Sequence, residues 1–135
     1  MSLTLTDQDK LTLRTAAYGA VSLLAAADAA GGSPHRIATD GSIALASATG
    51  PIGHVLADRT KGVHLDGKSV AQLADHVLPA LTVAMGLLRK QSLAEADNFR
   101  STVILAIGAA TTRYGEPSPS RAEMTRKIIA ALDAV

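Results

Sequence analysis

Two of the four histidines of this 135-residue chain lie close to acidic residues in the stretch GHVLADRTKGVHLDG, residues 53–67. His54 precedes Asp58 by four residues, and His64 precedes Asp66 by two. If the start of this stretch is helical, His54 and Asp58 share one helix face. Imidazole and carboxylate groups bind divalent metal ions and transfer protons near neutral pH. His54, Asp58, His64 and Asp66 are therefore candidate ligands of one divalent-metal site, or members of a catalytic or pH-responsive site.

The alternative for the same stretch is a polar surface loop between two buried helices. Residues 58–68 consist mainly of charged and histidine residues and include two glycines, a composition typical of loops. The metalloprotease pattern HExxH and the EF-hand loop pattern are both absent from the chain. The spacing therefore leaves a metal site and a solvated linker open, and only the path of the loop decides between them.

No other set of residues predicts catalysis. The chain has no cysteine, which excludes disulfides, thiolate nucleophiles and cysteine-ligated metal clusters. It also lacks a Gly-x-Ser-x-Gly nucleophile elbow and a phosphate-binding P-loop. The pair Asp75-His76 lies one turn before Pro79, where a kinked helix would open a pocket for a small apolar ligand or a lipid. We expect a protein that is not an enzyme and needs no cofactor.

Composition limits the class of protein. Apolar residues make up 47% of the chain and charged residues 19%, so we expect a single globular domain over residues 1–135. A net charge of +1 with few aromatic rings disfavours nucleic-acid binding. There is no signal-peptide pattern. The longest uncharged helical run, Thr15 to Ala27, is short for a membrane span, so we expect a cytoplasmic protein without a transmembrane segment.

Helical spacing of apolar residues between start and stop signals predicts core helices over residues 7–30, 69–90, 93–114 and 119–134. Three pairs have the spacing of a capping box or its variants: Thr6 and Asp9, Ser69 and Gln72, Ser92 and Glu95. The sequence leaves open whether residues 34–57 form one helix, two helices or partly a loop. No segment shows convincing strand alternation. The predicted fold is therefore all-α, a single irregular or orthogonal bundle of about five helices.

One internal similarity relates Tyr18–Arg36 to Val103–Arg121 at an offset of 85 residues. In each segment a helix of small residues leads through a glycine-containing turn to Ser-Pro-x-Arg, which opens the next helix. Two joints that use the same capping chemistry explain the similarity. The alternative is a duplicated helical hairpin packed about a pseudo-twofold axis.

The segments LTLRTAAYGAVSLLAAADAAGGSP, LDGKSVAQLADHVLPAL and AEADNFRSTV resemble small uncharacterised all-helical proteins of actinobacteria. That resemblance implies a helical fold and no particular activity. The helix ends also resemble the tellurite-resistance (TerB-like) helical domain, which has an Ala-Asp-Gly-Glu turn. Ala27-Asp28 and Gly115-Glu116 each keep half of that turn, and neither end carries the whole acidic set. This second resemblance implies an acidic metal site at Asp28 or Glu116.

Together these observations predict a non-catalytic helical interaction module that forms a homo-oligomer, most simply a homodimer. Ala- and Gly-rich helix faces on a short chain leave apolar surface that a partner covers. One alternative is a stress-related protein that binds a divalent metal ion. The other is a protein that binds a small apolar ligand or a lipid. The sequence names no protein partner, pathway or substrate.

Overall fold

Six helices account for nearly all of the chain that the computed structural model describes, namely residues 3–27, 34–58, 62–63, 65, 69–112 and 119–134. They are α1 (Asp7–Ala27), α2 (Pro34–Ala46), α3 (Gly50–Ala57), α4 (Val70–Arg89), α5 (Leu93–Thr112) and α6 (Pro119–Leu132). No strand occurs within these ranges. The all-α prediction is confirmed, with six helices in place of about five.

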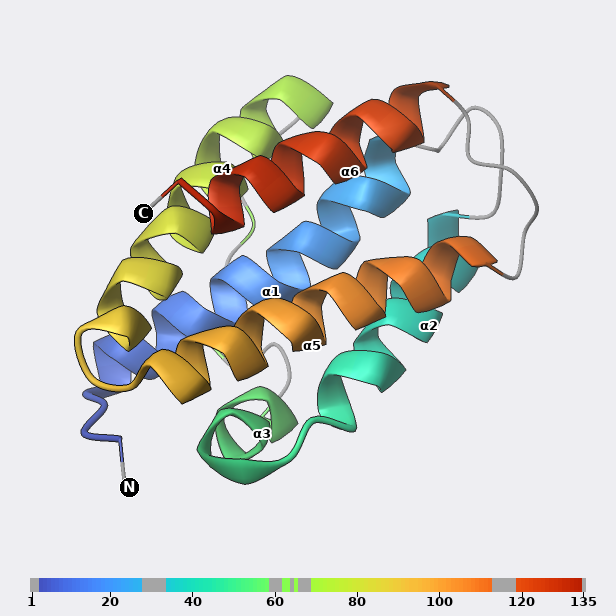
Figure 1. The fold of residues 1–135 in the computed structure, drawn as a ribbon. Helices are drawn as coiled ribbons and strands as arrows, with labels where there is room; N and C mark the ends of the chain where they lie inside the picture. The colour runs from blue at the N-terminus through green and yellow to red at the C-terminus, as the bar shows by residue number, and fades with distance from the viewer. Residues whose placement is uncertain are drawn as a thin grey trace.

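Helix α1 is the centre of the bundle. It contacts all five other helices, and its residues from Leu13 to Ala25 are almost all buried. Figure 1 shows α4 and α6 on one side of α1, with α2 and α5 on the other. Because the side chains of α1 are mainly Ala, Leu and Val, neighbouring helices pack against it on every side. Helix α1 is thus one of the predicted core helices and the one at the centre.

The predicted caps define where three helices begin. Thr6 and Asp9 bond reciprocally, each backbone N–H donating to the other side chain at 3.0 Å. The Ser69 hydroxyl accepts from the Gln72 N–H at 3.2 Å, and the Ser92 hydroxyl accepts from the Glu95 N–H at 3.3 Å. These bonds satisfy N–H groups that the first turn of a helix leaves without partners.

Residues 34–57 form two helices, which settles the point that the sequence left open. Helix α2 continues through Gly41, where the sequence allowed an interruption. A Cβ at Gly41 would lie 2.6 Å from Val21 Cγ1, so the glycine permits the close approach of α2 to α1. Helix α3 begins at Gly50, whose φ of 74° is readily adopted by glycine, and Pro51 follows in the first turn.

The two similar joints open with the same residue type but lead to different packing. Both α2 and α6 begin at the proline of Ser-Pro-x-Arg. Helix α2 packs along both α1 and α5, whereas α6 makes its main contacts with α4 and α1 and few with α5. The shared start is confirmed, and the duplicated hairpin stays a prediction.

A short hydrogen-bonded link fixes α3 to the core. The hydroxyl of Tyr18, a residue that is 2% exposed on α1, donates to the Leu56 carbonyl at 2.6 Å. Ile52, Val55 and Leu56 are buried beside it. His54, the one polar side chain of this helix, is exposed.

Candidate functional site

The structure places two of the four candidate metal ligands, and it gives them different surroundings. His54 is exposed on α3 and lines a hollow with Leu3, Leu5 and Lys10. Asp58 is the C-cap residue of α3, and its carboxylate lies 3.9 Å from the buried Arg14 guanidinium. The two side chains thus line separate hollows.

The other two candidates, His64 and Asp66, lie outside the described residues, as do Asp28 and Glu116. Within the described ranges, no group of three or more His, Asp or Glu side chains could hold a metal ion. The four-ligand site therefore stays a prediction. Of its two described members, Asp58 lies beside the guanidinium of Arg14.

A second candidate surface lies on α4, opposite its buried face. Val77, Leu81, Ala84, Met85 and Leu88 point into the core. His76, Pro79, Val83 and Lys90 are exposed, while Ala80, Gly86 and Leu87 are half-buried beside them. We call these seven residues the outer face of α4. Their spacing of three or four residues puts them along one side of the helix.

Val83 forms a ridge at the middle of the outer face, with 57% of its surface exposed. A hollow of about 410 Å³ lies on one side of it, lined by Gln8, Leu11, Thr12, Thr15, Gly62, His76, Pro79, Ala80 and Val83. A second hollow of about 370 Å³ lies on the other side, lined by Val83, Gly86, Leu87, Lys90 and Gln91. When two helices pack, ridges of side chains on one fit into grooves on the other. Val83 and the two hollows beside it have this shape.

Pro79 lies on this face without interrupting α4. Proline has no N–H, so the carbonyl of Asp75 has no helical donor from this position. Both Asp75 and Pro79 are exposed. The larger of the two hollows lies beside Pro79, and His76 lines it. A kink that opens a ligand pocket there stays a prediction.

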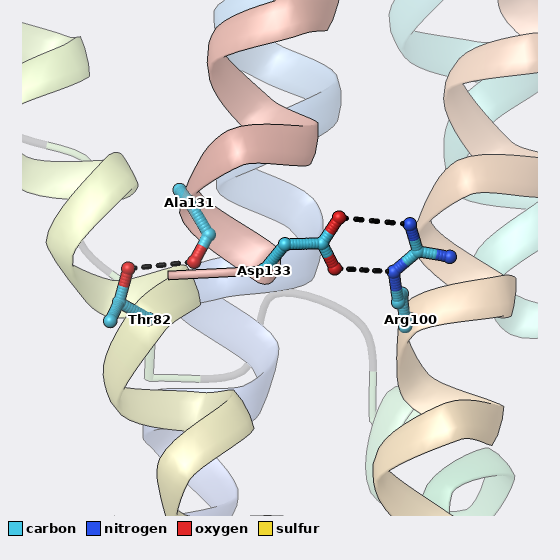
Figure 2. A network of polar contacts seen from close by, with 4 residues as sticks. All are labelled: Thr82, Arg100, Ala131 and Asp133. Atoms are coloured by element: carbon cyan, nitrogen blue, oxygen red, sulfur yellow. Dashed lines mark hydrogen bonds and ion pairs between the residues drawn. The ribbon is translucent and has the colours of Figure 1, made fainter. Parts of the chain in front are cut away.

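Polar contacts from two other segments hold α4 in place. The Thr82 hydroxyl donates to the Ala131 carbonyl of α6 at 2.7 Å (Figure 2). At the end of α4, the Gln91 side chain exchanges two hydrogen bonds with the Thr4 backbone, at 2.7 and 2.8 Å. The outer face is therefore carried by a helix that is tied at its middle and at its end.

A bidentate ion pair extends the first of these contacts to α5. Arg100 Nε and Nη2 donate to the two carboxylate oxygens of Asp133 at 2.7 and 3.0 Å (Figure 2). The hydrogen bond from Arg100 holds the pKa of Asp133 below its ordinary value, and it raises the pKa of Arg100. Asp133 immediately follows α6, so the end of α6 is fixed to both α4 and α5.

By length and composition α4 is also the one described helix that could cross a membrane. Only 22% of its most apolar window is buried within the protein. Core helices of other proteins pass the same test, so the finding is weak evidence for a span. It does show that α4 carries more apolar surface than the bundle covers.

The other large exposed apolar side chains lie elsewhere, on α2 and α5: Ile43, Leu93 and Leu105. Single exposed apolar side chains are ordinary features of protein surfaces, whereas a continuous apolar patch marks an interaction site. Apolar spacing predicted α4 as a core helix, and its outer face was not predicted. The signal was present, since residues 76, 79, 80, 83, 86 and 87 repeat with helical spacing.

Fold and site together define an all-α helical bundle with an apolar helix face left open to solvent. Comparison with known proteins adds nothing to that class, because no family model, no curated protein and no solved structure matches the chain. The resemblances noted in the sequence therefore stay expectations, and the outer face of α4 is the strongest functional candidate among the described residues.

Proposed function

We propose that this protein is a non-catalytic helical interaction module that self-associates through the outer face of α4. The observation that carries the proposal is the Val83 ridge between two apolar-lined hollows. A second copy has the same ridge and hollows, so the ridge of one copy can enter a hollow of the other. The proposal includes a cytoplasmic homodimer that needs no cofactor.

Burial of apolar surface stabilises such a dimer. Full burial of one valine side chain contributes about 1.5 kcal/mol or more, and a twofold interface buries each residue twice. Pro79, Ala80 and Leu87 add apolar surface on either side of Val83. Interfaces commonly have an apolar centre surrounded by a polar rim. His76 and Lys90 supply that rim along the helix.

The test is native mass spectrometry of the full chain with Val83→Glu and the matched control Leu105→Glu. Both residues are exposed apolar side chains in helices, at 57% and 70%. We expect a dimer mass for the wild type and Leu105→Glu, and a monomer mass for Val83→Glu with unchanged helical circular dichroism. A wild-type chain that stays monomeric at high micromolar concentration would refute self-association. A dimer that tolerates Val83→Glu would refute this face.

A second candidate function is the binding of a small apolar ligand or lipid, and the hollow beside Pro79 favours it. Its volume of about 410 Å³ is within the range of small-molecule sites, roughly 300–1,000 Å³. The same native spectra would show a co-purified ligand as an added mass. Ala80→Leu, which fills this hollow, should remove that mass. A bare protein mass in every spectrum counts against this candidate.

The spectra also test the metal alternative. Titration with zinc, calcium or manganese should add one ion per chain if His54, Asp58, His64 and Asp66 form a site. The double variant His54→Ala with Asp58→Asn would then lose that ion. If no stoichiometric ion binds to the wild type, the metal alternative is wrong.

A further inference from the structure

Opposite charges lie beside the two ends of the outer face. Asp75 is exposed one turn before Pro79. It is the one acidic residue of α4. Arg89 and Lys90 are exposed at the other end of the helix. Between them the surface is apolar or neutral except for His76. A surface with an acidic end and a basic end is complementary to a second copy of itself in reversed direction.

The spacing of these residues fits that reversal. Asp75, Thr82 and Arg89 are seven residues apart and lie along one flank of the outer face. His76, Val83 and Lys90 repeat with the same spacing, one residue further on. When two such helices pack antiparallel about an axis near Thr82, residue 75 of each lies opposite residue 89 of the other.

We infer that two copies of α4 pack antiparallel across their outer faces, with each Asp75 beside the partner subunit's Arg89. The inference rests on the proposed function and names the arrangement of its partner. The interface is isologous, so the charge pair forms twice. A parallel pair would instead put Asp75 beside Asp75 and Arg89 beside Arg89, and like charges in contact oppose association.

The same register agrees with the shape of the face. It sets the Val83 ridge beside the partner subunit's Pro79, and His76 beside the partner subunit's Gly86. Gly86 has no side chain, so it leaves room for the imidazole in the smaller hollow. Gln72 falls opposite the partner subunit's Lys90 at the ends of the contact. The imidazole of His76 thus meets the smallest residue of the outer face.

Asp133 is an acidic group of the same chain that interacts with Arg89. Arg100 first, and Arg89 to a lesser degree, hold the pKa of Asp133 low. Asp133 already accepts two hydrogen bonds from Arg100, and Arg89 remains exposed. The Arg89 guanidinium is therefore accessible to a carboxylate from another chain, and its loss leaves the ion pair of Asp133 intact.

Charge reversal tests the pairing. Asp75→Arg and Arg89→Asp should each weaken dimerisation about tenfold or more, since one substitution removes two pairs and sets like charges together. The double variant should restore the dissociation constant to within a few fold of the wild type. Ser101→Arg, on the exposed side of α5, is the matched control and should leave it unchanged. A double variant no tighter than the singles overturns the pairing.

Cysteine cross-linking tests the direction, because the natural chain contains no cysteine. Within one chain, Gln72 and Lys90 lie about 27 Å apart along α4 at 1.5 Å per residue, so they cannot link to each other. An antiparallel dimer predicts disulfides when Gln72→Cys and Lys90→Cys proteins are mixed, and none with either protein alone. Disulfides from Lys90→Cys alone would show a parallel pair and overturn the inference, while leaving self-association through α4 in place.

The alternative partner for the outer face is a lipid surface, since α4 is apolar enough to enter one. Flotation with vesicles of neutral and of anionic phospholipid measures it directly. We expect the wild-type chain to remain a dimer and to stay unbound. Binding that Val83→Glu abolishes, together with a monomeric mass, would overturn both the antiparallel dimer and the proposed self-association.

Discussion

Among single residues, Gly53 shows how closely the short helix α3 packs against the chain that precedes it. A Cβ at this position would lie 2.2 Å from the Ala48 carbonyl oxygen and 2.7 Å from its carbon. These are backbone atoms, which cannot move aside as the end of a flexible side chain can. Residue 53 also lies next to His54, so the position of that candidate ligand depends on this contact.

We therefore predict that Gly53→Ala destabilises the protein by about 1–3 kcal/mol, the usual cost of an overpacked contact. The measurement is the midpoint of urea unfolding. Gly108→Ala is the control, because a Cβ there would meet nothing within 4 Å and alanine favours the interior of α5. We expect it to be neutral or to stabilise by about 1 kcal/mol or less. Equal effects of the two substitutions would contradict this account.

For single residues, sequence spacing did not predict the surroundings of the candidate ligands His54 and Asp58. The i, i+4 spacing of His54 and Asp58 predicted a shared helix face, and Asp58 instead terminates α3 as its C-cap. Its carboxylate faces Arg14, a residue about forty positions earlier in the chain. Local spacing contains no information on such a distant contact. The sequence could nominate His54 and Asp58, and only the packing of α1 against α3 shows which group each one meets.

At the scale of the helices, α4 depends on its N-cap. The Ser69 hydroxyl accepts from the Gln72 N–H, which would otherwise have no partner within the first turn. We predict that Ser69→Ala lowers the free energy of unfolding by about 1 kcal/mol. Chemical denaturation measures the change, and the exposed mid-helix substitution Ser101→Ala should alter it little. A stability unchanged by Ser69→Ala would show that α4 is held by packing and not by its cap.

The helices themselves were largely predictable. Capping boxes and apolar stripes mark local events, and the starts of α1, α4, α5 and α6 agree with the sequence to within one residue. The extent of α2 was left open by the sequence, because the sequence does not show that Gly41 rests against Val21 of α1 while the helix continues through it. The outer face of α4 was missed for a related reason. A helix with apolar residues on two sides gives no local sign of which side the bundle will bury.

At the scale of the whole molecule, polar contacts of the described residues join helices that are far apart in the sequence. Arg100 of α5 reaches Asp133 after α6, and the neighbouring Ala131 carbonyl accepts from Thr82 of α4. These contacts fix three helices at one point of the bundle, as Figure 2 shows. Everything else between the helices is mainly apolar packing around α1. The orientation of α4, and hence of its outer face, therefore depends partly on an ion pair that α4 does not contain.

The ion pair between Arg100 and Asp133 makes the free energy of unfolding depend on pH. Folding lowers the pKa of Asp133, so the unfolded chain binds its proton more readily than the folded one. The stabilisation by Asp133 is present above its ordinary pKa and is lost as pH falls through the lower, folded value. We predict that Asp133→Asn is less stable than the wild type at neutral pH, and that the difference shrinks as pH falls below about 4.

The quantity to measure is the difference in unfolding free energy between wild type and variant at each pH, since the other carboxylates titrate in both proteins. The pair is exposed to solvent, so the difference should be small and should also shrink in high salt. Arg100→Gln should reproduce the effect of Asp133→Asn, and the double variant should add little to either. A difference that persists at acidic pH would mean that Asp133 stabilises the bundle through packing, and not through its charge.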